Sequence, residues 1–224
     1  MKRSKKIKSV FVFLLALALA MFPCVAYAAE SFGTVGYHCY KNNPSSGIVI
    51  IGDSNTCQLW GYQHSSASYC STWGGHYGYG AGMGLQINSS SYVAQMKTLI
   101  RNTLKKKGKC TVFVCGTNND DNDSYAASNC MFLVKTLNSY FSKNKVIGKR
   151  PVFYAVGPNG DRGENMNAYN TALRRYVSSY RSSYVKYTHI ADCLAGSRGG
   201  FLSDDTHYNN ATLKKIITKS ERLA

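Results

Sequence analysis

Apolar and polar positions along the chain fall into two kinds of segment, short continuous apolar runs and longer stretches with helical spacing. The apolar runs predict buried strands at residues 47–51, 111–115, 151–156 and 185–190. Helical spacing predicts helices at residues 91–107, 124–142, 165–180 and 209–224. Strands that alternate with helices favour an α/β fold, a three-layer α/β/α sandwich with a central parallel sheet.

Local signals support the boundaries of these helices. Val93, Met96, Ile100 and Leu104 form one apolar stripe, and Gly108 follows as a typical helix stop. Asp123 is placed to cap the next helix. Residues 61–84 are rich in Gly, Ser, Tyr and His, which predicts loops that carry functional groups.

Polar residues with catalytic chemistry follow two of the expected strands. Ser54 comes just after the first strand, and Asn118 follows the second. In parallel sheets of this kind, sites lie at the carboxyl ends of the strands. Near the C-terminus, Asp204 precedes His207 by three residues, so that a carboxylate and an imidazole can meet within one turn. A serine needs such a base, and the base needs an acid to hold its tautomer.

These motifs resemble those of the SGNH hydrolases, also called the GDSL family. The matching positions are Gly52-Asp53-Ser54, residues 116–119 and residues 204–207, in the family's order and over most of the chain. The resemblance implies a flavodoxin-like fold and ester hydrolysis, with Ser54 as nucleophile, His207 as base and Asp204 orienting the base. The chain departs from the family pattern at Asn119, where an aspartate is usual.

The resemblance also implies an oxyanion hole. Its donors are the Ser54 amide, the Asn118 side chain and the backbone N–H of one glycine within residues 73–80. Gly78 and Gly75 are both candidates, and the sequence does not choose between them.

Other side chains compete for these roles. His38, His64, His76 and His189 are alternative bases, although His189 is expected in a strand as a packed core residue. Asp205 is an alternative partner for His207. Trp73, Tyr79 and His76 lie in the Gly-rich stretch and are candidates for substrate contacts, the aromatic rings by stacking on sugars.

The N-terminus has the form of a secretory signal peptide. Basic residues precede an apolar run at 10–21, and Ala26-Tyr27-Ala28 fits a cleavage site before Ala29. We therefore expect an exported chain, residues 29–224, that forms one domain without a membrane-spanning segment. Loss of the five basic residues of the leader, which has no acidic ones, lowers the formal charge from +16 to +11.

The net charge and the cysteine content indicate which partners, disulfides and metal sites the protein could have. The basic surface favours contact with an anionic cell-wall polymer or glycan, whereas no nucleic-acid motif is present. Seven cysteines follow the leader, an odd number that leaves at least one outside any intrachain disulfide. They lack the spacing of metal ligands, and no cofactor is expected.

The sequence thus predicts a secreted, monomeric serine esterase that acts on short acyl groups, such as acetyl esters of a glycan or cell-wall polymer. Two alternatives remain: an O-acyltransferase on the same scaffold, and an inactive glycan-binding or wall-binding protein. The joint presence of the serine, the oxyanion asparagine, the aspartate and the histidine argues against the inactive binding protein.

Overall fold

The computed structural model describes residues 39–40, 47–52, 55–56, 59, 78–81, 90–115, 122–160, 162 and 164–224. All of them belong to one compact unit, Phe32–Ala224. The expected leader at residues 1–28 lies outside the described residues. Among the helices that are described, none is long and apolar enough to cross a membrane.

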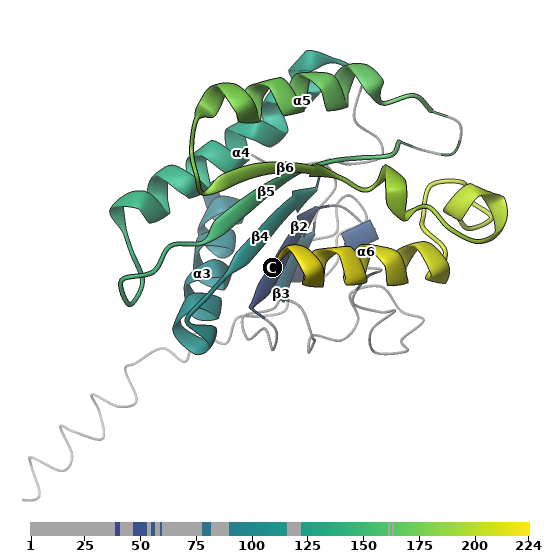
Figure 1. The fold of residues 1–224 in the computed structure, drawn as a ribbon. Helices are drawn as coiled ribbons and strands as arrows, with labels where there is room; N and C mark the ends of the chain where they lie inside the picture. The colour runs from purple at the N-terminus through teal and green to yellow at the C-terminus, as the bar shows by residue number, and fades with distance from the viewer. Residues whose placement is uncertain are drawn as a thin grey trace, which may run out of the picture. The chain divides into compact units, whose positions relative to one another are not determined.

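A six-stranded sheet forms the centre of the described structure, in the order β1-β3-β2-β4-β5-β6 (Figure 1). Its parallel strands are β2 (Ile48–Gly52), β3 (Gly78–Ala81), β4 (Thr111–Cys115), β5 (Val152–Gly157) and β6 (Val185–His189). The short β1 (Cys39–Tyr40) pairs antiparallel with β3 at one edge. The four strands expected from the apolar runs are confirmed within one residue at each end.

One expectation about the loops is wrong. Residues 61–84 were expected to be loops, but β3 lies within them and pairs with β2 along its whole length. The sequence Gly-Tyr-Gly-Ala has no continuous apolar run. Its strand conformation is therefore set by pairing with its neighbours on both sides.

Helices cover both faces of the sheet because successive strand residues point to opposite sides. Val49 and Ile51 of β2 belong to the core under α3 (Ser90–Lys107), α4 (Ser124–Lys143) and α5 (Asn167–Tyr180). Ile48 and Ile50 belong to the second core, under α6 (Asn210–Leu223) and the 3-10 turn η1 (Ala191–Cys193). The three-layer α/β/α class is confirmed.

Helix ends follow local chemistry. The Asp123 carboxylate accepts a hydrogen bond from the Ala126 N–H at 2.8 Å, which caps α4 as expected. Asn209 caps α6 in the same way through the Thr212 N–H. Gly108 follows α3 at a φ of 68°, a conformation that suits glycine.

A buried position on α4 tests the core under this helix. We expect Leu137→Ala, at a fully buried site, to lower the free energy of unfolding by about 2–5 kcal/mol. Phe132→Ala on the same helix is the control, since this side chain is 54% exposed and should change stability by less than about 0.5 kcal/mol. Urea unfolding followed by circular dichroism measures both, and equal losses would contradict the assigned helix face.

Candidate active site

Asp204 and His207 form a hydrogen-bonded pair in the loop before α6. The His207 Nδ1 atom lies 2.8 Å from Asp204 Oδ2. The other oxygen, Oδ1, accepts the backbone N–H groups of Thr206 at 3.1 Å and His207 at 2.9 Å. One carboxylate thus shapes the turn and orients the imidazole, the geometry that a base and its acidic partner require.

The same contacts set the charge of Asp204. Burial alone would raise its pKa, but the hydrogen bonds from the backbone and ring of His207 outweigh burial and lower it. The carboxylate is therefore ionised at neutral pH. Because the folded pKa is depressed, this turn adds stability above the unfolded pKa of about 3.9 and loses it as pH falls through the folded value.

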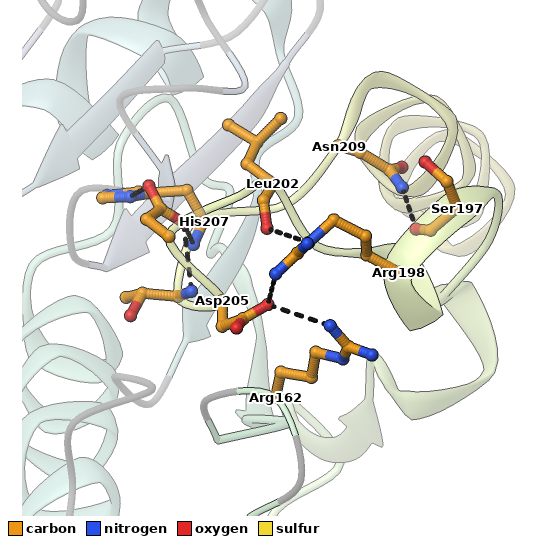
Figure 2. A network of polar contacts seen from close by, with 9 residues as sticks. Arg162, Ser197, Arg198, Leu202, Asp205, His207 and Asn209 are labelled. Carbon is orange, nitrogen blue, oxygen red and sulfur yellow. Dashed lines mark hydrogen bonds and ion pairs between the residues drawn. The ribbon is translucent and has the colours of Figure 1, made fainter.

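Asp205 faces away from the imidazole and pairs with two arginines (Figure 2). Its Oδ1 atom lies 2.7 Å from Arg198 Nη2 and 3.3 Å from Arg162 Nη1. The hydrogen bond from Arg198, with that from Arg162, lowers the pKa of Asp205. The structure therefore pairs His207 with Asp204, the partner that the sequence favoured, and not with the alternative Asp205.

The two arginines also brace the loop backbone. Arg162 donates its backbone N–H to the Asp205 carbonyl at 2.8 Å, and Arg198 Nε donates to the Leu202 carbonyl at 3.1 Å. The Leu202 N–H closes the loop on the His207 carbonyl at 2.7 Å. Asp205 itself has a φ of 59°, a strained value for a non-glycine residue that these bonds hold in place.

Asn55 connects this loop to the helical turn that follows β2. Its Nδ2 donates to the Thr206 carbonyl at 3.5 Å, and its Oδ1 accepts the Tyr208 N–H at 3.2 Å. The side chain is only 6% exposed, so the contact lies inside the protein. The residue directly after Ser54 in sequence is thereby bonded to both backbone neighbours of His207. We call this pair of bonds the Asn55 bridge.

Tyr208 fixes the other side of the bridge. It is 2% exposed, and its ring contacts the ring of Phe201 with centroids 5.4 Å apart. Asn159, just beyond β5, donates to the Tyr208 hydroxyl at 3.5 Å. The backbone that carries His207 is therefore attached to the carboxyl end of the sheet at two points.

Several sequence-predicted residues lie outside the described residues. They are Ser54, Asn118, Gly75, Trp73 and His76, together with the alternative bases His38 and His64. Their roles stay predictions.

The strand register gives the positions of Gly78 and Tyr79 within β3. Gly78 begins β3 and pairs with Val49, whereas Ala81 pairs with Gly52 at the carboxyl end. Three residue steps of about 3.3 Å separate Gly78 from that end. Gly78 therefore lies at the start of the strand, and its role as an oxyanion donor stays a prediction. Tyr79 lies inside the strand opposite Ile50, and not in a loop as expected.

His189 lies in a strand as expected, at the end of β6, but the expectation that it belongs to the core is wrong because its side chain is exposed. Among the described cysteines, Cys110 and Cys193 are buried free thiols, and burial, with Asp192 beside it, raises the pKa of Cys193 to about 11. No group of three or more His, Cys, Asp or Glu in the described part of the chain could hold a metal ion.

Sequence reasoning did not identify Asn55, Arg162 or Arg198 as part of the site. The available signal for Asn55 was a polar residue between the candidate nucleophile and the apolar Leu59, at the start of a helix under the sheet. Nothing in the sequence around Arg162 or Arg198 indicates that they meet at Asp205.

No protein-family model matches the sequence, and no curated protein matches it. Among solved structures, the chain is similar to a candidate lipolytic protein of the G-D-S-L family from Desulfitobacterium hafniense DCB-2. The identity is 15%, the TM-score is 0.46, and the match covers 80% of this chain and 100% of that chain. That family is the one that the sequence motifs resemble. At this identity, the chemistry of the site has to come from this chain's own residues.

The Asn55 bridge can be tested without an activity assay. Asn55→Ala leaves a buried N–H and a carbonyl without their partner, so we expect the free energy of unfolding to fall by about 1–3 kcal/mol. Hydrogen exchange at the Tyr208 amide should also become faster. Asn210→Ala, an exposed asparagine on α6, is the control and should leave that amide unchanged. Unchanged protection of Tyr208 in Asn55→Ala would show that the bridge does not hold the loop.

Proposed function

We propose that this chain is a serine hydrolase that cleaves carboxylic esters through an acyl-enzyme. The observation that carries the proposal is the Asn55 bridge next to the Asp204–His207 pair. Neighbouring Cα atoms are about 3.8 Å apart, so Ser54 cannot lie far from Asn55. A serine tied by its neighbour to the backbone on both sides of a paired histidine is well placed for activation.

The roles follow from this pairing. With Nδ1 of His207 on Asp204, the imidazole takes the Ser54 proton through Nε2 as the hydroxyl oxygen attacks the ester carbonyl. The Asp204 carboxylate stabilises the imidazolium. The imidazolium then gives its proton to the leaving alcohol, and the acyl group stays on Ser54. Water attacks the acyl-enzyme with His207 again as base, which releases the acid and restores the serine.

The oxyanion that forms during attack needs donors at the carboxyl end of the sheet. Asn118 and the Ser54 amide are proposed donors, as the sequence motifs imply. For the glycine donor we propose Gly82 in place of Gly78 or Gly75. The register ends β3 at Ala81 opposite Gly52, so that Gly82 is the next backbone N–H in chain order, just as Asp53 and Ser54 follow β2.

The substrate we propose is a short acyl ester, such as an acetyl group on a glycan or cell-wall polymer. The formal charge of +16 for the whole chain, and +11 without the five basic residues of the leader, favours an anionic polymer. We propose a monomeric enzyme that is secreted and acts at the cell wall. The expected leader supports the secretion.

A fluorophosphonate probe tests the nucleophile directly. We expect the purified protein to be labelled once, on the peptide that contains Ser54, and Ser54→Ala to abolish both labelling and hydrolysis of 4-nitrophenyl acetate. Mass spectrometry locates the label. A folded protein that is not labelled would favour the inactive binding protein, and acyl transfer to a sugar faster than hydrolysis would favour the acyltransferase.

A matched pair of variants separates the two aspartates. Asp204→Asn removes the charge that supports His207, so kcat should fall by about 100-fold or more. Asp205→Asn breaks two half-exposed ion pairs that do not touch His207, so kcat should change by no more than about fivefold. Steady-state hydrolysis of 4-nitrophenyl acetate gives both values. The reverse ranking would make Asp205 the partner of the base.

A further inference from the structure

A cavity of about 220 Å³ lies between the first half of α5 and the edge strand β6. The helix contributes Asn167, Asn170, Thr171 and Arg174, which share one face because they are three or four residues apart. The strand contributes Tyr187 and His189. At about 30 Å³ for each water molecule, the cavity has room for about seven waters or for one small ring.

Gly157, the last residue of β5, lies close to two of the lining residues. A Cβ atom there would lie 1.8 Å from Asn170 Oδ1 and 3.1 Å from the Tyr187 hydroxyl, so a side chain at this position would clash. Asn170 Nδ2 donates to the Pro158 carbonyl at 3.1 Å. Asn170 Oδ1 is buried and accepts no hydrogen bond within the described structure. The Asn170 side chain, which lines the cavity, is therefore held in place by its contacts with Pro158 and Gly157.

The charge of the lining is positive. Arg174 is exposed, and in the described part of the chain it has no carboxylate within ion-pair distance. None of the residues that line the cavity is acidic. Asp192, next to the rim, is held by Lys219 Nζ at 2.6 Å. The cavity therefore offers a guanidinium, a phenol and an imidazole, which suit a ligand with a carboxylate.

The cavity also connects to the candidate active site. Asn159 donates to the Ile190 carbonyl at 3.4 Å, one residue from the lining residue His189, and to the Tyr208 hydroxyl, one residue from His207. Both places lie at the carboxyl end of the sheet. Strands β2 and β6 are three steps apart, or roughly 14 Å at about 4.8 Å for each step, a span that a short oligosaccharide can cover.

We propose that this cavity binds a carboxylated sugar unit of the glycan whose ester is cleaved at Ser54. The inference rests on the proposed esterase function and adds a specificity site to it. Arg174 holds the carboxylate, and the amide and hydroxyl groups of Asn167 and Thr171 meet the ring hydroxyls. The Tyr187 ring gives the sugar an apolar surface.

Direct binding tests the site without any turnover. Titration calorimetry of the purified protein with D-glucuronate should show binding, and Arg174→Gln should weaken it by about tenfold or more, since a charge-assisted hydrogen bond is lost. Arg175→Gln is the matched control: it removes the same charge from the adjacent exposed position, outside the cavity, and should leave the affinity unchanged. Glucose and acetate should each bind more weakly than glucuronate.

The outcomes separate this site from the proposed function. No glucuronate binding, or equal weakening in the two arginine variants, overturns the site even if Ser54 is labelled. Acetate binding as tightly as glucuronate overturns the sugar ligand. Binding that depends on Arg174 supports the site even if Ser54 is not labelled, in which case the hydrolase proposal alone fails. For an active enzyme, Arg174→Gln should raise KM for an acetylated, glucuronate-containing oligosaccharide and leave kcat/KM for 4-nitrophenyl acetate unchanged.

Discussion

The Asn55 bridge is the contact on which the arrangement of the site depends. It joins positions 55 and 208, which are 153 residues apart in sequence, through one buried side-chain amide. A carboxamide suits this position because it offers a donor and an acceptor on one planar group, one for the Thr206 carbonyl and one for the Tyr208 N–H. A buried polar group left without such partners would cost stability, so folding of the core and closure of the loop are coupled. The turn after β2 and the loop before α6 therefore behave as one unit.

In the loop before α6, the two neighbouring carboxylates of Asp204 and Asp205 make different contacts. Asp204 accepts hydrogen bonds from the backbone and pairs with the imidazole, whereas Asp205 joins Arg162 to Arg198. Asp205 itself has a left-handed backbone conformation, and the two adjacent carboxylates point in different directions. The outer ion pairs are half exposed and add little energy individually. Arg162 and Arg198 also donate hydrogen bonds to the Asp205 and Leu202 carbonyls, and these bonds restrict the loop to one shape. This restriction matters more than the energy of the ion pairs, because the ring of the base must be oriented.

The carboxyl end of the sheet carries both the Asp204–His207 pair and the arginine-lined cavity, and Asn159 bonds to residues next to each. These groups come from the segments that follow β5, β6 and η2 (Ser197–Gly200). Such segments can vary in sequence while the strands beneath them keep the positions fixed.

The sequence by itself determined the layered fold. A continuous apolar run is buried as a central strand, and an apolar stripe with helical spacing is buried as one face of a helix. Residues 111–115, for example, form β4 with the predicted boundaries. It also determined the Asp204–His207 pair, because three residues of spacing fix that contact locally. It could not find β3, whose Gly-Tyr-Gly-Ala sequence has no strand pattern and takes its conformation from β1 and β2. It could not reveal the roles of Asn55, Arg162 and Arg198 either. Those depend on backbone direction and on contacts between segments distant in sequence, which only the packed sheet and loops decide.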